Sequence, residues 1–464
     1  METKTTHRKV LGGLDLMLFS VSAVLVLDTV AGSAALGMQT FFWYILTLIA
    51  LFIPYGMISA ELGAAIPDEG GLYVWVTRAF GKTTGMLVSW LYWINVAYWM
   101  PSVYMIFAGT LAALFFPKLG TWGQVAIAVA MTWATVYIGI QALNKSKQVP
   151  NIGAVTKVIV LIALGAVGIA AIADKGFANP VASFRDFMPD WSNAIGYLPY
   201  VVYNFMGFEL MSSMGASMHN PKKDVPKAIL GAGALIFVFY VIGTWGILAT
   251  LPIKDITFTG IIDAIQMSLQ QFGGAGHTFS IIFGVLILYS LFSNMVTWTL
   301  GANEMIAVAA QEGDMPAVLG KMHPTKNTPV AAYVITGIIG TVLLVGNGFF
   351  ADSSSSIFAI IFALSSLVFL LPYLFMFPAF LKLRYSEPGL ERPFMVPGGK
   401  VGAWIMAIIC EVFIAVASFL FFYQPATEVS SLAMYRLQVG GVTAVTVVLG
   451  YALYRWAKSH AARA

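Results

Sequence analysis

The first long apolar segment of the sequence is interrupted by Val26-Leu27-Asp28-Thr29-Val30-Ala31-Gly32-Ser33-Ala34-Ala35-Leu36-Gly37. Small residues and glycine make local unwinding of a helix inexpensive. Inside a bilayer, unwound backbone survives only where its N–H and C=O groups find partners or line a polar cavity. The stretch therefore predicts an interrupted membrane helix, unless it is a small-residue seam packed against a neighbouring helix.

The composition of the chain is that of a membrane protein. Of its 464 residues, 59% are hydrophobic and 10% are charged, whereas an ordinary soluble domain is about 25% charged. The net charge of +4 comes from basic residues scattered through short loops, which is not typical of nucleic-acid binding. The single cysteine, Cys410, excludes a disulfide within the chain.

Twelve apolar segments are long enough to cross a bilayer, which takes ~20 residues. They are residues 14–37, 41–66, 84–116, 122–141, 149–173, 192–216, 227–251, 277–308, 329–347, 354–381, 402–423 and 437–456. With twelve spans, nineteen Lys and Arg residues lie on the side of the termini and five on the other side, with Lys157 inside a span. The positive-inside rule then predicts that both termini are cytoplasmic.

The sixth apolar segment is also interrupted, by Tyr203-Asn204-Phe205-Met206-Gly207-Phe208-Glu209. The first and sixth segments are corresponding positions of two five-helix repeats. Paired interrupted helices in such positions are the best sequence indication of a transporter's binding site, which would lie between them.

Other functional classes find little support in the sequence. It has no phosphate-binding lysine motif of an ATP-driven pump, no dinucleotide fingerprint and no metal-ligand spacing among its five histidines. The longest polar gaps, residues 174–191, 252–276, 309–328 and 382–401, are of loop size. No catalytic pair is evident, so we expect no enzyme activity, no cofactor and no metal.

Several motifs resemble those of the amino acid–polyamine–organocation (APC) transporters, in the order found in that family. They are Gly12-Gly13-Leu14-Asp15, Glu61-Leu62-Gly63-Ala64-Ala65-Ile66-Pro67-Asp68-Glu69-Gly70-Gly71-Leu72-Tyr73-Val74-Trp75, Ala79-Phe80-Gly81, Gly207-Phe208-Glu209, Asn220-Pro221-Lys222-Lys223-Asp224-Val225-Pro226-Lys227-Ala228, Glu312-Gly313-Asp314-Met315-Pro316, Thr328-Pro329-Val330, Arg392-Pro393-Phe394 and Pro397-Gly398-Gly399. Together they cover residues 10 to 400, and their combination is more specific than any one of them.

This resemblance implies an all-α membrane protein of the leucine-transporter (LeuT) type. Its twelve transmembrane helices would form a first five-helix repeat at residues 10–173, a second, inverted repeat at 192–383, and two additional helices at 402–456. Helices 1 and 6 would be broken, and the chain would be a single membrane domain.

The sequence departs from the family's pattern at two places. Many members have Gly-Ser-Gly in the first break, where this chain has Ala31-Gly32-Ser33-Ala34. The acidic residues usual before Asn220 are replaced by Gly215-Ala216-Ser217-Met218. Asp28, just before the first break, resembles the glutamate–GABA exchanger and polyamine-uptake branches.

Asp28, Lys157 and Glu209 are charged residues within apolar segments, where a charge costs at least ~2.5–3.5 kcal/mol. Asp28 could pair with a substrate amine, carry a proton, or pair with Lys157. Lys157 could replace a sodium ion and hydrogen-bond the unwound first helix, as the resemblance implies, or extend to the interface as a solvated side chain. For Glu209 the resemblance implies a structural or coupling role.

The substrate is expected to lie between the two breaks. The candidate substrate-binding residues are Asp28, Val30, Ala31, Gly32, Ser33, Tyr203, Asn204, Phe205, Gly207 and Trp298, and the coupling residues are Lys157 and Glu209. Among the aromatic residues, Tyr98, Trp99, Phe205, Phe208 and Trp298 could close the site or stack on an amine, or could simply pack. Trp298 and Phe205 are preferred as gates because they lie on spans that face the predicted site.

The sequence therefore predicts a secondary active transporter of amino acids or related small amines. It would be a proton symporter or an exchanger, independent of sodium, in the plasma membrane or a bacterial inner membrane. A dedicated polyamine or amine carrier is the alternative, favoured by Asp28 and the missing Gly-Ser-Gly. A membrane amino acid sensor is a third hypothesis. The expected partners are the substrate, the lipid bilayer and protons, and no nucleic acid.

Overall fold

The computed structural model describes residues 9–141, 143–189, 198–256, 260–269, 273–350, 354–423 and 432–461. Within these residues, ten helical stretches are long and apolar enough to cross a membrane. They are α3–α4 (Gln39–Thr47 and Ile53–Ala65, joined by a π-helical turn at Leu48–Phe52), α6 (Lys82–Phe115), α7 (Thr121–Gly139), α8–α9 (Leu143–Ser146 and Gln148–Lys175), α11 (Pro221–Thr250), α13 (Gly273–Gln311), α14 (Val330–Phe350), α15–α16 (Ser354–Leu370 and Tyr373–Ser386), α17 (Gly399–Tyr423) and α18 (Leu432–Ala461).

The first predicted span is interrupted where the sequence indicated. Helix α1 (Gly13–Val24) stops at Leu25 and Val26, a 3-10 turn follows at Leu27–Thr29, and the short α2 (Val30–Ala34) completes the segment. Neither half is long enough to count as a continuous span. The stretch is therefore an unwound point and not an uninterrupted helix with a small-residue seam.

The sixth predicted span is interrupted as well. Helix α10 (Leu198–Tyr203) ends just before Asn204, and 3-10 helices follow at Phe208–Ser213 and Gly215–Ser217. Gly207 has a φ of 122°, a left-handed conformation that glycine adopts without a steric penalty. The chain can therefore turn sharply here before it re-enters a helical conformation.

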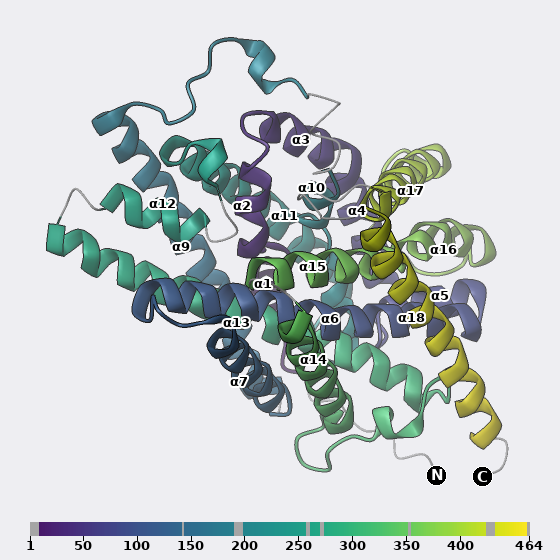
Figure 1. Ribbon diagram of the computed structural model, residues 1–464. Helices are drawn as coiled ribbons and strands as arrows, with labels where there is room; N and C mark the ends of the chain where they lie inside the picture. The colour runs from purple at the N-terminus through teal and green to yellow at the C-terminus, as the bar shows by residue number, and fades with distance from the viewer. Residues whose placement is uncertain are drawn as a thin grey trace.

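Long helices surround the two interrupted segments. Helix α13 and helix α15 both pack against α6, and the three lie beside one another through the middle of the molecule (Figure 1). Helix α1 packs against α9, α11 and α13. The first break is thus enclosed by helices from distant parts of the sequence.

One predicted loop contains a helix. Residues 252–276 were expected to form a loop, but Gly260–Leu269 form α12, which packs against α9 and α13. Ile261, Ile262 and Ile265 are buried there. This apolar face explains why the segment is helical although it is too short to cross a bilayer. Another short helix, α5 (Leu72–Phe80), packs against α6 and α16.

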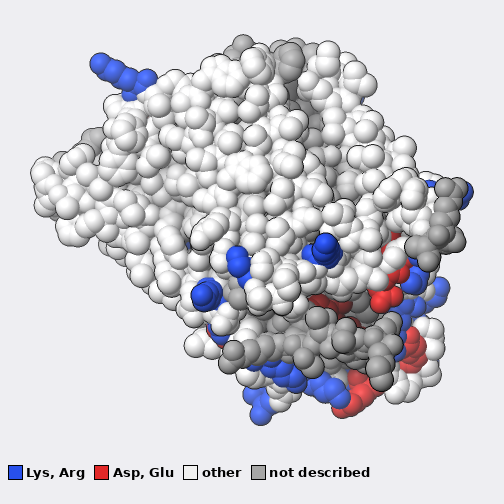
Figure 2. Space-filling model, turned by 90° about the horizontal axis from the view of Figure 1, so that it is seen from below, with Lys and Arg blue, Asp and Glu red and all other residues white. Residues whose placement is uncertain are grey.

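Charged side chains are distributed unevenly over the surface. Seen from below, they gather toward one end of the molecule, and most of the remaining face shows none (Figure 2). This is the distribution expected when a protein's apolar sides face lipid and its charges lie in loops.

Candidate functional site

The carbonyl groups at the end of α1 are held by side chains from two other helices. The Ser22 carbonyl accepts hydrogen bonds from Lys157 Nζ of α9 (2.6 Å) and Asn294 Nδ2 of α13 (2.7 Å). The Ala23 carbonyl accepts one from Trp298 Nε1, also of α13 (3.0 Å). The break therefore persists because its freed acceptors have strong donors.

A tyrosine bridges the break itself. The Tyr240 hydroxyl on α11 donates to the Val24 carbonyl (2.6 Å) and accepts from the Val26 N–H (2.8 Å). One hydroxyl thus replaces two hydrogen bonds that a continuous helix would have made internally.

The second break is organised around Tyr55 of α4. Its hydroxyl accepts hydrogen bonds from the N–H groups of Gly207 and Phe208, both at 2.8 Å, and donates to the Glu209 carboxylate. Because both lone pairs and the proton of this hydroxyl are used, the turn around Gly207 and the orientation of Glu209 are fixed together.

Glu209 is fully buried and receives three tyrosine hydroxyls. Tyr92 of α6 and Tyr373 of α16 each donate to its Oε1 at 2.6 Å, in addition to Tyr55. Hydrogen bonds to a charged group contribute about 1.5–3 kcal/mol each, which offsets part of the several kcal/mol that burial of a carboxylate costs. No cationic side chain pairs with Glu209 in the part of the chain that the structure describes.

Aromatic rings form a continuous cluster beside Glu209. Trp298 meets Trp99 edge-on at 5.5 Å and Phe369 at 5.2 Å, and its ring stacks on Tyr92 at 6.0 Å. Tyr203 joins the cluster through Trp99 at 5.8 Å. The faces of such rings attract cations, most strongly when water is excluded.

Two amide oxygens near the breaks are buried and have no hydrogen-bond partner among the described residues. They are Asn204 Oδ1 and Asn294 Oδ1. The Nδ2 group of Asn204 donates to Ser33 Oγ at 2.7 Å, which ties the second half of the first span to the sixth. A buried oxygen without a hydrogen bond destabilises the folded protein. A ligand that donates hydrogen bonds to these oxygens would remove that cost.

The predicted site residues meet only in part. Ser33, Tyr203, Asn204, Gly207, Trp298, Lys157 and Glu209 lie at or around the two breaks. An added Cβ on Gly207 would lie 2.9 Å from Trp298 Cζ2, so a larger residue would collide with the indole. Lys157 is buried, which argues against a side chain extended to the interface.

Other predicted residues lie apart from the aromatic cluster. Phe205 packs against Tyr44, Phe52 and Tyr240 and not against Trp298. Tyr98 bonds to Thr446 of α18. Val30 packs near Gly243, Ala31 near Gly260, and Gly32 is half-buried within α2. The backbone of Asp28 belongs to the 3-10 turn, but its side chain lies outside the described residues.

The sequence reasoning missed five residues of the site. They are Tyr55, Tyr92, Tyr240, Asn294 and Tyr373. The sequence did contain a signal for the tyrosines. A carboxylate and unwound carbonyl groups inside a membrane both require hydrogen-bond donors, and tyrosine combines a large apolar ring with a hydroxyl donor. Nothing in the sequence, however, indicates which of the nineteen tyrosines faces Glu209.

The fold and the site define a class of protein, a polytopic α-helical membrane transporter with interrupted helices. The chain matches the family "Amino acid permease" over residues 11–448 and belongs to that family. This confirms the resemblance inferred from its motifs. It is a transporter of the amino acid and amine class and not an enzyme.

Curated relatives are similar over most of their lengths. The chain is 33% identical over 380 residues, 82% of its length and 80% of the relative, to the "Probable agmatine/putrescine antiporter" of Lactococcus lactis. It is 31% identical over 411 residues, 87% and 86% of the two chains, to an uncharacterized transporter of Legionella pneumophila. It is 24% identical over 430 residues, 89% and 84%, to the "Glutamate/gamma-aminobutyrate antiporter" of Lactococcus lactis.

Proposed function

We propose that this protein exchanges small cationic amines of the agmatine and putrescine type across the membrane. The observation that carries the proposal is Glu209, a buried carboxylate whose partners are hydroxyl groups, next to rings whose faces attract cations. The relative named as an agmatine/putrescine antiporter supports the same substrate class.

The number of spans and their division into repeats are part of the same proposal. Twelve spans would form two inverted repeats, at residues 10–173 and 192–383, followed by two helices at 402–456. The breaks at the first and sixth positions support this arrangement. So do the two longest helices, α6 with 34 residues and α13 with 39, at the third and eighth positions. The excess of basic residues on one side supports cytoplasmic termini.

In the proposed mechanism, a substrate amine lies between the two breaks. It donates hydrogen bonds to the free oxygens of Asn204 and Asn294 and lies against the face of Trp298. Asp28 contributes a negative charge from the 3-10 turn. Lys157, fixed on the Ser22 carbonyl, supplies the positive charge that a sodium ion supplies in sodium-coupled relatives of this fold.

Glu209 provides a link between binding and movement. Its three tyrosines come from α4, α6 and α16, so a cation that draws the carboxylate away loosens contacts among all three helices. Rocking of one group of helices against the other then exposes the amine to the opposite side.

Exchange of amino acids is the second candidate function. The relative named as a glutamate/gamma-aminobutyrate antiporter favours it. A substrate carboxylate would bind amides of residues 31–34. Ser33 Oγ there already accepts from Asn204, and Ala31 packs near α12, so we favour amines without a carboxylate.

Exchange is tested with the purified protein in liposomes. Vesicles are loaded with putrescine, agmatine, glutamate or γ-aminobutyrate, or left empty, and uptake of labelled putrescine is followed. We expect uptake only into vesicles that contain putrescine or agmatine. The uptake rate should saturate as the external putrescine concentration rises, and it should not depend on sodium. Uptake into empty vesicles driven by a proton gradient would instead establish symport.

The role of Asp28 is tested by ligand-induced thermal stabilisation, which rises with the concentration of any ligand that binds the folded state alone. Amines should stabilise the wild type more than Asp28→Asn. If zwitterionic amino acids alone stabilise, and Asp28→Asn responds equally, the amino acid function is favoured and Asp28 is structural.

A further inference from the structure

Two cavities adjoin on the outer side of α16 and α17. One, of about 400 Å³, is lined by apolar side chains that include Phe377, Pro378 and Ile408. The other, of about 240 Å³, is lined by Arg384, Arg392 and Lys400. Leu381 and Tyr385 line both cavities, so the two form one groove with an apolar part and a basic part.

The apolar part faces the space that lipid would occupy. It is bounded by α17, whose Trp404 and Ile408 are about half exposed (45% and 51%), by α16, and by Phe80 at the end of α5. From Lys400 at the start of α17 to Glu411, the deepest lining residue on this helix, the rise is ~16 Å. That is close to half of a bilayer's ~30 Å hydrocarbon core, the depth of one lipid leaflet.

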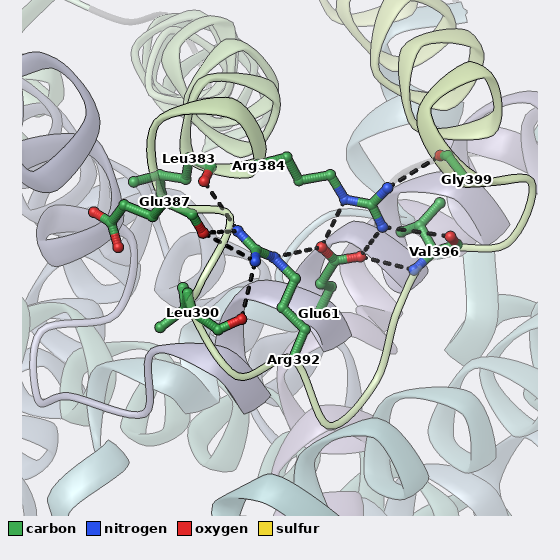
Figure 3. A network of polar contacts seen from close by, with 8 residues as sticks. All are labelled: Glu61, Leu383, Arg384, Glu387, Leu390, Arg392, Val396 and Gly399. Carbon is green, nitrogen blue, oxygen red and sulfur yellow. Dashed lines mark hydrogen bonds and ion pairs between the residues drawn. The ribbon is translucent and has the colours of Figure 1, made fainter.

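The basic part has a surplus of positive charge. Arg384 and Arg392 share one carboxylate, Glu61, so this trio retains a net charge of one (Figure 3). Lys400 in the basic part and Lys382, which lines the adjoining apolar part, add two more charges, and neither pairs with a carboxylate in the described part of the chain. The groove therefore offers positive charge at its mouth.

The two lysines are held above aromatic rings without using their N–H groups. Lys382 Nζ lies 4.9 Å from the centre of the Phe80 ring, and Lys400 Nζ lies 5.6 Å from that of Tyr385. Trp404 Nε1 donates to the Tyr385 hydroxyl at 2.8 Å. Tryptophan and tyrosine with basic neighbours are typical of the level of lipid headgroups, and both ammonium groups keep their donors for an external acceptor.

We propose that this groove binds an anionic phospholipid, with its phosphate between Lys382 and Lys400 and one acyl chain along the apolar part. Basic pockets between transmembrane helices are suited to anionic headgroups. Apolar walls one leaflet deep are suited to an acyl chain. Because Tyr385 lines both cavities, one lipid molecule can occupy the basic part with its headgroup and the apolar part with its acyl chain.

Glu411 fixes the orientation of the ligand. Its Oε2 is buried without a partner among the described residues, and it lies in the apolar part of the groove. A negatively charged group could not approach it, so the phosphate must stay at the lysines and the neutral chain must pass the carboxyl. A cationic amphiphile would instead bind in the opposite orientation, with its amine at the Glu411 carboxyl.

Bound lipid would support a contact between helices. Arg384 donates to Glu61 of α4 and to the Gly399 carbonyl at the start of α17 (3.0 Å), and it lines the basic cavity. A phosphate at Lys400, the next residue after Gly399, would hold the start of α17 in the position where the Gly399 carbonyl accepts from Arg384. The protein would then be more stable in membranes that contain anionic lipid.

The experiment uses the purified full chain in a nonionic detergent after removal of lipid. Native mass spectrometry and thermal unfolding compare phosphatidylglycerol with phosphatidylcholine of the same acyl chains, and with soluble glycerol phosphate. We expect phosphatidylglycerol to bind and to raise the unfolding temperature, and the other two compounds to have a much smaller effect. A lysine near a headgroup is worth about a fivefold change in affinity, so Lys382→Gln and Lys400→Gln should each lower it about fivefold, and the double variant about 25-fold.

Two variants serve as controls. Lys382→Arg with Lys400→Arg keeps the charges and should restore binding, and Glu411→Gln should leave the preference for phosphatidylglycerol unchanged. Both lysines are exposed, so their variants should unfold at the wild-type temperature when no lipid is present. Unchanged binding in the double glutamine variant would overturn the proposal. Loss of phosphatidylglycerol binding in Glu411→Gln alone would also overturn it, because the headgroup would then depend on that carboxyl and not on the lysines. Occupation of the groove by a second copy of the chain would overturn it too. The proposal does not depend on the transported substrate.

Discussion

Glu61 and Glu209 are two glutamates of the same protein, both buried, with opposite surroundings. Glu61 receives two hydrogen bonds from Arg384, at 2.8 and 2.5 Å, a third from the Val396 N–H, and the charge of Arg392. Glu209 receives three tyrosine hydroxyls. The first carboxylate is paired with two arginines, whereas the second has no cationic partner in the part of the chain that the structure describes.

The difference separates a carboxylate held in an ion pair from one held, among the described residues, by hydroxyl groups. Glu61 joins α4 to α16 and to the loop before α17, and its bidentate pair with Arg384 has little freedom (Figure 3). Glu209, at the second break, has no cationic partner among the described residues, and in the proposed mechanism its ionised form pairs with a substrate cation. The same residue type thus joins elements of the fold at one place and, in the proposed mechanism, pairs with the substrate at the other.

The largest loss of stability is expected for Glu61→Gln. Removing this charge leaves Arg384 and Arg392, whose side chains are about a tenth exposed, without their shared buried counterion, and breaking a buried ion pair typically costs about 3–5 kcal/mol. Thermal unfolding in detergent measures the effect. Glu391→Gln is the matched control, because Glu391 pairs with Lys222 at the surface, where such a pair is worth at most ~1 kcal/mol. Equal effects of the two variants would contradict the comparison.

Glu209→Gln should have the opposite profile. The amide oxygen can still accept from Tyr92 and Tyr373, but the amide nitrogen cannot accept from Tyr55, so we expect stability to fall by about 1–3 kcal/mol, less than in Glu61→Gln. Affinity for a cationic amine should fall about thirtyfold or more, since loss of a buried charge partner costs ~2 kcal/mol at least. Amine exchange in liposomes and amine-induced thermal stabilisation both report this. A variant that unfolds early but binds amines normally would place Glu209 with Glu61 as a structural charge.

Tyr373→Phe tests whether Glu209 is charged in the folded protein. A hydrogen bond to a charged acceptor is worth about 1.5–3 kcal/mol, and one to a neutral acceptor about 0.5–1.5 kcal/mol. Tyr435→Phe is the control, because its hydroxyl donates to the neutral Phe421 carbonyl at 2.6 Å. Thermal unfolding at neutral pH should show the larger loss for Tyr373→Phe. Similar losses would indicate a neutral Glu209.

The sequence predicted the breaks because they depend on local chemistry. The first break lies at Leu25–Thr29, beside Asp28 and just before the small residues around Gly32, and the second lies at Gly207; a bilayer tolerates such interruptions only at a polar site. It also indicated that Lys157 meets the first break, through the family resemblance. The partners of Glu209 could not be predicted in the same way. Tyr55, Tyr92 and Tyr373 come from three helices far apart in the sequence, and the rotation of each helix decides which residue faces the carboxylate.

The aromatic residues illustrate the same limit. Trp298 and Phe205 both lie on spans that border the site, and sequence reasoning treated them alike. The structure puts Trp298 beside Trp99 and Phe369, and Phe205 beside Phe52 and Tyr240. A residue next to an unwound turn can point to either side of it, and packing against neighbouring helices decides which.

The smallest effect is expected at a third glutamate, Glu69, in the loop between α4 and α5. Burial raises the pKa of its carboxyl from 4.5 to about 7, and Glu304 of α13 lies within electrostatic range. The folded protein therefore holds this proton to a higher pH than the unfolded chain. The contribution of Glu69 to stability is most favourable below pH 4.5, declines as the pH rises toward about 7, and is constant above it.

Glu69→Gln should remove this decline and leaves Glu61 and Glu209 themselves unchanged. Above pH 7 we expect the variant to unfold about 1–3 °C higher than the wild type, and the two to converge at acidic pH. Thermal unfolding between pH 5 and pH 8, in one buffer series of constant ionic strength, measures the difference. If the wild type is the more stable protein at pH 8, the Glu69 carboxylate has a stabilising partner when charged, and it belongs with Glu61 among the structural charges.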